Sequence, residues 1–174
     1  MSQALSAHQL IEQLGGPDGS SRHRAYEELV GRGPSALSAI NAGLEDPRWQ
    51  VRRWCAMALD RLADAESIQR LIPLLTDDHS LVRLWATHSL ACDQCKETGI
   101  ESPVDAVPLL IDRLQNDASI RVRRMAAAML ANHHPDERAF AVFRDLLEQE
   151  PDRKIRLHAD FGLRRTPATC YAAG

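Results

Sequence analysis

VRRWCAMAL, residues 51–59, is the stretch that decides the fold, because four variants of it recur along the chain. The variants are SRHRAYEEL from residue 21, VRLWATHSL from residue 82, VRRMAAAML from residue 122 and IRLHADFGL from residue 155. We call the first residue of each copy its anchor. In every copy arginine follows one position after the anchor, a small residue four positions after it and leucine eight positions after it. Self-similarity at a spacing of 30 to 40 residues indicates a tandem repeat.

The repeated positions share one face of a helix. The anchor and the residues four and eight positions later lie on the same side at 3.6 residues per turn, and the small residue lets a neighbouring helix approach closely. Four copies carry an acid five positions before the anchor, where it would cap the helix. These acids are Asp46, Asp77, Asp117 and Glu150. Pro47 and Pro151 would then occupy the first helical position, where proline is favoured.

A second amphipathic segment precedes each anchored helix, with apolar residues at intervals of three and four. Pro73 lies late in one of these segments and should kink it. Short polar connections that contain turn residues join the segments. The chain therefore consists of five predicted helical hairpins, over residues 3–31, 34–63, 65–92, 103–132 and 135–166.

A hairpin of this size cannot bury its apolar face alone, whereas stacked neighbours share one core. The sequence thus predicts an all-α fold, a right-handed α-solenoid of ten helices that forms a single domain over residues 1–166. Residues 167–174, which include Cys170, are expected to form a flexible tail. The longest interval between anchors contains ACDQCKETGIESP, residues 91–103, as an insertion.

The arginine column has two interpretations. In the first, which we favour, each guanidinium reaches an acid of the adjacent repeat, so that the arginine and acid columns form a structural ladder. In the second, the arginines bind phosphate groups. The arginines concerned are Arg22, Arg52, Arg83, Arg123 and Arg156.

The pattern acid-x4-Val-Arg-x2-Ala-x3-Leu, with an amphipathic helix before it, resembles the short HEAT-like repeats of the phycobilisome lyase type over about residues 3–166. The resemblance implies that the second helix of each pair lines a concave surface. Such repeats serve as scaffolds in many unrelated proteins, so the resemblance is specific for fold rather than for function.

The solvent side of the anchored helices carries leucines, aromatic residues and arginines where an inert surface would be polar. An apolar patch bordered by arginine is typical of a binding surface, and it suits an acidic, amphipathic peptide or protein, or a second copy of the chain. Packing between repeats is the other interpretation of the two tryptophans. The predicted partner-binding residues are Arg53, Trp54, Met57, Leu81, Leu84, Trp85, His88, Arg121, Arg124, Met125, Leu157 and Phe161.

We therefore expect a non-catalytic module for protein–protein interaction. Two alternatives remain: an arginine-lined groove that holds nucleic acid, and an accessory subunit of a lyase-type enzyme complex. The net charge of −3 and the leucines among the arginines disfavour nucleic acid. The sequence contains no G-x-S-x-G, glycine-rich phosphate loop or H-E-x-x-H motif that would indicate catalysis.

The insertion raises the question of a metal, because two cysteines lie three positions apart and a histidine precedes them by one helical turn. Two histidines of the next repeat would meet the same edge of the stack, and the set is compatible with a structural zinc ion. The interpretation that we favour is a loop with free thiols and solvated histidines, without a cofactor, and a redox pair is a further alternative. The candidate ligands are His88, Cys92, Cys95, His133 and His134, and no other cofactor is expected.

The sequence also bears on location. No apolar run approaches the ~20 residues of a membrane span. The first 16 residues lack the basic start and apolar block of a secretory signal, and four irregularly spaced cysteines do not form a disulfide framework. We expect a cytoplasmic protein that makes no contact with membranes.

Overall fold

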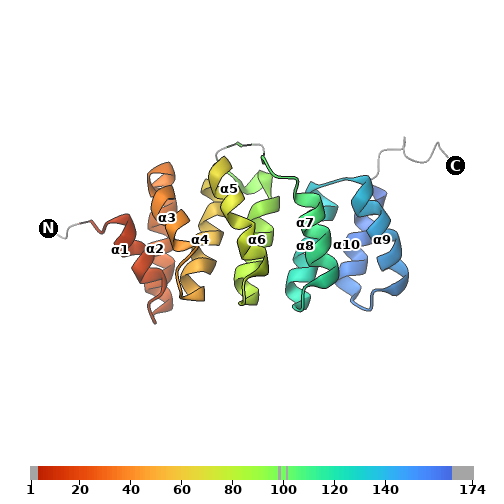
Figure 1. The fold of residues 1–174 in the computed structure, drawn as a ribbon, viewed down its shortest axis with the longest axis horizontal. Helices are drawn as coiled ribbons and strands as arrows, with labels where there is room; N and C mark the ends of the chain where they lie inside the picture. Colours follow the sequence, from red (N-terminus) through yellow and green to blue (C-terminus); the bar gives the residue numbers. More distant parts are fainter. Residues whose placement is uncertain (1–3, 98, 101, 166–174) are drawn as a thin grey trace. The chain divides into compact units, whose positions relative to one another are not determined.

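The computed structural model describes residues 4–97, 99–100 and 102–165, and all regular secondary structure in that part of the chain is helical. The helices follow one another in pairs along the sequence, as Figure 1 shows by colour. The predicted all-α fold built from five helical hairpins is confirmed. The pairs are α1 (Ala7–Leu14) with α2 (Gly19–Gly31), α3 (Leu37–Gly43) with α4 (Trp49–Leu62), α5 (Ala65–Leu71) with α6 (Ser80–Ala91), α7 (Ala106–Asn116) with α8 (Ile120–His133), and α9 (Glu137–Gln149) with α10 (Arg153–Arg164).

Three short 3-10 helices, η1 (Gly33–Ala36), η2 (Pro73–Thr76) and η3 (Asp93–Cys95), accompany these pairs. Pro73 opens η2, and α5 ends two residues before it at Leu71. The predicted interruption at this proline is therefore confirmed, because proline lacks the N–H that would continue the α-helical ladder. Over the described residues, no helix combines the length and the apolar character needed to cross a membrane.

The chain divides into two compact units, residues 1–104 and residues 105–174. The first unit contains α1 to α6, and the second unit contains α7 to α10. The sequence predicts one continuous domain, whereas this division falls at the end of the insertion. The predicted tail, with Cys170, lies outside the described residues.

The core of each unit is built from the repeated columns. In α4 the anchor Val51, the small residue Cys55 and Leu59 are all fully buried, and the corresponding positions of α6 and α8 are buried as well. A Cβ added at Gly43 of α3 would lie 2.5 Å from the Cys55 sulfur, so the two helices touch closely at this point. Burial of one such leucine stabilises the fold by about 1.5–3 kcal/mol.

The acids before the anchored helices are not N-caps, and that prediction is wrong by two positions. The N-cap residues of α4, α6, α8 and α10 are Arg48, His79, Ser119 and Asp152. Each acid instead accepts the backbone N–H of the N-cap residue, with N···O distances of 2.8, 2.8, 2.8 and 2.9 Å at Asp46, Asp77, Asp117 and Glu150. Acids favour such turns because their side chains bond the backbone two residues on. Pro47 and Pro151 therefore precede the helices.

The arginine column holds these same turns. Arg52 Nη1 donates to the carbonyl oxygens of Asp46 and Pro47, at 2.9 and 3.1 Å. Its Nε and Nη2 also donate to the carboxylate of Asp77 in the next repeat, at 2.7 and 3.0 Å. The other four arginines repeat the bond to the carbonyl six residues earlier, and they are Arg22, Arg83, Arg123 and Arg156.

The contact shared by all five arginines is thus a hydrogen bond that links the turn before each anchored helix to that helix. The predicted contact between repeats is seen as the pair between Arg52 and Asp77. At Asp46, where the ladder would place Arg22, the carboxylate is held by Arg48 at 2.9 and 2.7 Å.

Candidate functional site

The predicted partner-binding residues of the first unit lie on α4 and α6, which pack against each other. All of them are half-buried, so each side chain gives part of its surface to packing and leaves part open. We call this set the first-unit face, and it comprises Arg53, Trp54, Met57, Leu81, Leu84, Trp85 and His88.

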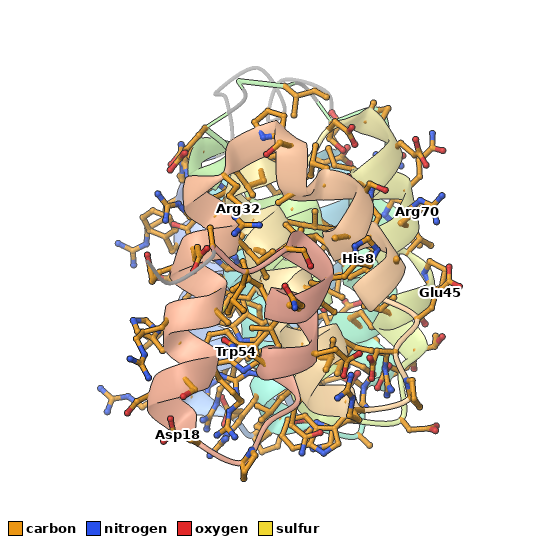
Figure 2. The ribbon with its side chains drawn as sticks, turned by 90° about the vertical axis from the view of Figure 1, so that its left-hand side faces the viewer. His8, Asp18, Arg32, Glu45, Trp54 and Arg70 are labelled. Carbon is orange, nitrogen blue, oxygen red and sulfur yellow. The ribbon has the colours of Figure 1, made fainter. Side chains whose placement is uncertain are left out.

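Trp54 is packed against the preceding repeat. Its ring centroid lies 5.2 Å from that of Tyr26 and 6.4 Å from that of His23, both on α2. Figure 2 views this end of the chain and shows Trp54 well away from Arg70 and Glu45, which lie at the opposite margin. Packing between repeats therefore accounts for one side of the Trp54 ring, while the residue stays half-buried.

Arg53 differs from the arginines that hold the turns. Its guanidinium carbon lies 5.2 Å from the centroid of Trp54, a cation–π contact. Its Nε is buried and has no hydrogen-bond acceptor among the described residues. Burial, and then the charge of Arg22, lowers the pKa of Arg53. A half-buried cation favours an incoming carboxylate.

In the second unit, α8 and α10 pack together and carry the remaining predicted residues. Leu157 is 55% exposed and Phe161 is 45% exposed, one turn apart on α10. Arg124 forms a two-point pair with the carboxylate of Asp152, at 3.1 and 2.6 Å. We call this set the second-unit face, and it comprises Arg121, Arg124, Met125, Leu157 and Phe161.

The thiols of the insertion form a cluster with two residues of the neighbouring helices. One potential ligand atom from each of Asp60, His88, Cys92 and Cys95 lies within 4.8 Å of every other. His88 Nδ1 lies 2.9 Å from an oxygen of Asp60, and Cys92 is only 2% exposed. Burial, with a hydrogen bond to Cys92, raises the pKa of the Cys95 thiol to about 12.

Three of the five predicted metal ligands, His88, Cys92 and Cys95, therefore meet in the first unit. His133 and His134 belong to the second unit and are not among the four residues of this cluster. Asp60, near the end of α4, supplies the fourth donor. The sequence does not distinguish Asp60 from other acids near helix ends, and only the packing of α4 against α6 brings it to the cysteines.

Hydrogen bonds link the first residues of the insertion, 92–97, to one another and to the end of α4. Lys96, whose side chain is completely buried, donates to the carbonyl oxygen of Cys92 at 2.8 Å. The backbone N–H of Glu97 donates to the carbonyl of Arg61 at 2.9 Å, and the two side chains form an ion pair. Residues 92–97 are thus a folded segment fixed to α4 and α6.

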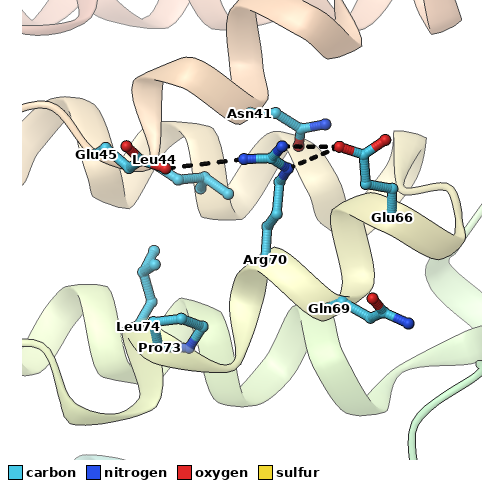
Figure 3. A pocket seen from close by; sticks show the side chains of 8 residues that line it. All are labelled: Asn41, Leu44, Glu45, Glu66, Gln69, Arg70, Pro73 and Leu74. Atoms are coloured by element: carbon cyan, nitrogen blue, oxygen red, sulfur yellow. Dashed lines mark hydrogen bonds and ion pairs between the residues drawn. The ribbon is translucent and has the colours of Figure 1, made fainter.

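A separate hollow of about 570 Å³ lies between α3 and α5, lined by no residue of the first-unit face, and Figure 3 shows it closely. Arg70 spans it, with nitrogens 2.8 Å from Glu66 and 3.8 Å from Glu45. The buried amide oxygen of Asn41 has no donor among the described residues. Since Arg70 is already paired with two carboxylates, the hollow offers no free cation to an anionic ligand.

Comparisons with known proteins agree with this architecture. A family model described as HEAT repeats matches residues 7–91 and 98–164. A chain in the complex of CpcE and CpcF of phycocyanin lyase from Nostoc sp. PCC7120 has a similar structure, with a TM-score of 0.75 and 20% sequence identity, over 90% of this chain and 96% of that one. An engineered protein is 19% identical over 92% of this chain and 96% of its own, with a TM-score of 0.45. No curated protein sequence matches.

Proposed function

Since the chain belongs to the HEAT-repeat family, we propose that it is a non-catalytic scaffold whose second helices bind an acidic, amphipathic segment of a protein partner. The observation that carries this proposal is the environment of Arg53. Its guanidinium is held against Trp54, and the residue is half-buried on a face rich in apolar side chains. A carboxylate flanked by apolar residues would pair with this cation and cover the apolar side chains around it.

The second-unit face supports the same type of partner. Leu157 and Phe161 expose about half of their surfaces on one side of α10. Large apolar side chains that remain open to water lower the free energy of binding when a partner covers them, and aromatic residues often dominate such interfaces.

The contacts of the arginines count against the nucleic-acid alternative. Arg124 pairs with Asp152 through two hydrogen bonds, and Arg53 is half-buried against a tryptophan. Phosphate binding would have to break the first pair, so fewer cations are available than the sequence suggests.

An accessory role in an enzyme complex would be one form of the proposed function. The phycocyanin lyase structure is a complex of two proteins, CpcE and CpcF. If this chain likewise pairs with another protein, the faces of its second helices are the surfaces that we expect to be covered.

The test uses two labelled helical peptides that share one pattern of leucines and differ only in charge, one acidic and one basic. The acidic peptide should bind the whole chain more tightly. Arg53→Gln should weaken its binding about 10-fold or more, because a hydrogen bond to a charged group contributes about 1.5–3 kcal/mol. The matched control, Arg70→Gln on the first helices, should bind as the wild type does.

Equal binding of the two peptides, or weakening by Arg70→Gln alone, would contradict the proposal. Competition by single-stranded DNA that falls steeply with salt would favour the nucleic-acid alternative instead. Self-association that disappears in Phe161→Ser would identify a second copy of the chain as the occupant of the second-unit face.

A further inference from the structure

The cluster of Asp60, His88, Cys92 and Cys95 has the composition and spacing of a metal site. The donors come from three places: Asp60 from α4, His88 and Cys92 from the end of α6, and Cys95 from η3. Their ligand atoms lie within 4.8 Å of one another. Ligand atoms around a tetrahedral zinc ion, with bonds of about 2.0–2.3 Å, lie about 3.3–3.8 Å apart, so small side-chain rotations suffice to close the site.

The donor types select the metal. Two sulfurs, one imidazole and one carboxylate match the ligands of zinc, and thiolates disfavour Mg²⁺ and Ca²⁺, which prefer oxygen. Four protein donors fill a tetrahedral shell and leave no position for a substrate or an activated water molecule. The site is therefore of the closed, structural type rather than the catalytic type.

Lys96 fixes the backbone beside the cluster. Its side chain is completely buried, it donates to the carbonyl oxygen of Cys92 at 2.8 Å, and Asp93 lies 3.5 Å from its Nζ. These contacts hold Cys92, one of the four donors, in place.

We propose that Asp60, His88, Cys92 and Cys95 bind one zinc ion that fixes the start of the insertion to α4 and α6. The ion joins two neighbouring repeats and the start of the insertion that follows α6, at the end of the first unit. The ring of His88 lies edge-on to Trp85, with centroids 5.6 Å apart. The zinc site thereby also orients one aromatic residue of the first-unit face.

The proposal is tested on the full-length chain, first by elemental analysis of protein purified without chelators. We expect about one zinc ion per chain. After removal of zinc, addition of Co²⁺ should give the visible and near-ultraviolet absorption bands of tetrahedral cobalt bound to thiolates. These readouts do not depend on any partner, so they can succeed or fail independently of the proposed function.

Substitutions locate the ion. Cys92→Ser with Cys95→Ser should abolish zinc binding and the cobalt bands, and Asp60→Asn should weaken zinc binding by at least about 10-fold. Cys55→Ala is the matched thiol control, because alanine occupies that column in the other four repeats. Asp78→Asn is the matched carboxylate control, because Asp78 is exposed and lies in the first unit but outside the cluster. Both controls should keep the metal.

Circular dichroism shows whether each variant remains helical. A folded wild-type chain that takes up neither zinc nor cobalt would overturn the proposal. So would zinc that survives in the folded double cysteine variant, because the ion would then lie elsewhere. A Cys92–Cys95 disulfide found by mass spectrometry in protein purified without oxidants would establish the redox pair in place of the zinc site.

Discussion

The first-unit and second-unit faces come from the same repeat pattern, yet they differ in how much apolar surface they leave open. Leu84 and His88 on α6 are half-buried, whereas Leu157 and Phe161, at the equivalent positions of α10, are exposed. Burial at one repeat position therefore differs between copies that carry the same residue type, since both positions are leucine in the case of Leu84 and Leu157.

The two units also differ in how their turns are reinforced. The first unit combines the Arg52–Asp77 pair between repeats with the cluster around Cys92, whereas the second unit relies on Arg124 with Asp152 and on Arg138 with Asp105 and Asp136. Arg138 and Asp105 are each about half exposed, so their pair is weak in water. Because these contacts differ, substitutions in the first unit and in the second unit should change the free energy of unfolding by different amounts.

Loss of the metal should have the largest effect and should be confined to the first unit. With free zinc at about 1,000 times its Kd, the ion stabilises the unit that binds it by about 4 kcal/mol. Chelation should therefore increase hydrogen exchange in α4 and α6 and leave α9 and α10 unchanged. Equal loss of protection in both units would contradict the local role of the site.

Arg52→Gln should have the next largest effect. The change removes the pair with Asp77 and two bonds to turn carbonyls, and both side chains are largely buried. We expect a loss of about 2–3 kcal/mol in the free energy of unfolding of the first unit, measured by urea denaturation. Arg138→Gln, on the more exposed pair of the second unit, is the comparison and should cost less.

The same pair predicts a dependence on pH. Burial alone would raise the pKa of the Asp77 carboxyl, but hydrogen bonds from Arg52 and from the backbone of His79 hold it below its usual value. A lowered folded-state pKa gives stability that is fully present above the unfolded value of about 3.9 and lost as the pH falls through the folded pKa. Denaturation curves from about pH 6 to pH 2.5 should show the wild type and Arg52→Gln converging at the acid end. If the free energies of unfolding of the wild type and Arg52→Gln differ by the same amount at every pH, the ionised Asp77 carboxylate is not the source of the stability.

Substitutions on α10 should have the smallest effect on stability. Since Leu157 and Phe161 are about half exposed, Leu157→Ser and Phe161→Ser should each change the free energy of unfolding by less than about 1 kcal/mol. Trp85→Ala in the first unit should cost more, because the ring is half-buried and contacts His88. Thermal melts of the three variants compare their losses of stability. A larger loss for Leu157→Ser or Phe161→Ser than for Trp85→Ala would contradict the prediction.

The repeated columns were enough to predict the fold, since anchors such as Val51, Val82 and Val122 are buried as helical periodicity requires. The N-caps were predicted two residues too early, at the acids themselves. An acid can bond the backbone either as the N-cap or in the turn before the helix, and the sequence does not distinguish the two. Asp60 could not be found from spacing along one helix, since the cluster depends on the packing of α4 against α6. The different exposure of Leu84 and Leu157 could not be predicted either, since both are leucines at the same repeat position.

Hydrogen–deuterium exchange of the full chain, with and without the bound acidic peptide, tests the central claim most directly. If the second helices form the binding surface, added protection should fall on α4 and α6, on α8 and α10, or on both pairs, and should be lost from α4 and α6 in Arg53→Gln. Protection confined to α3 and α5, around Arg70, would contradict the account.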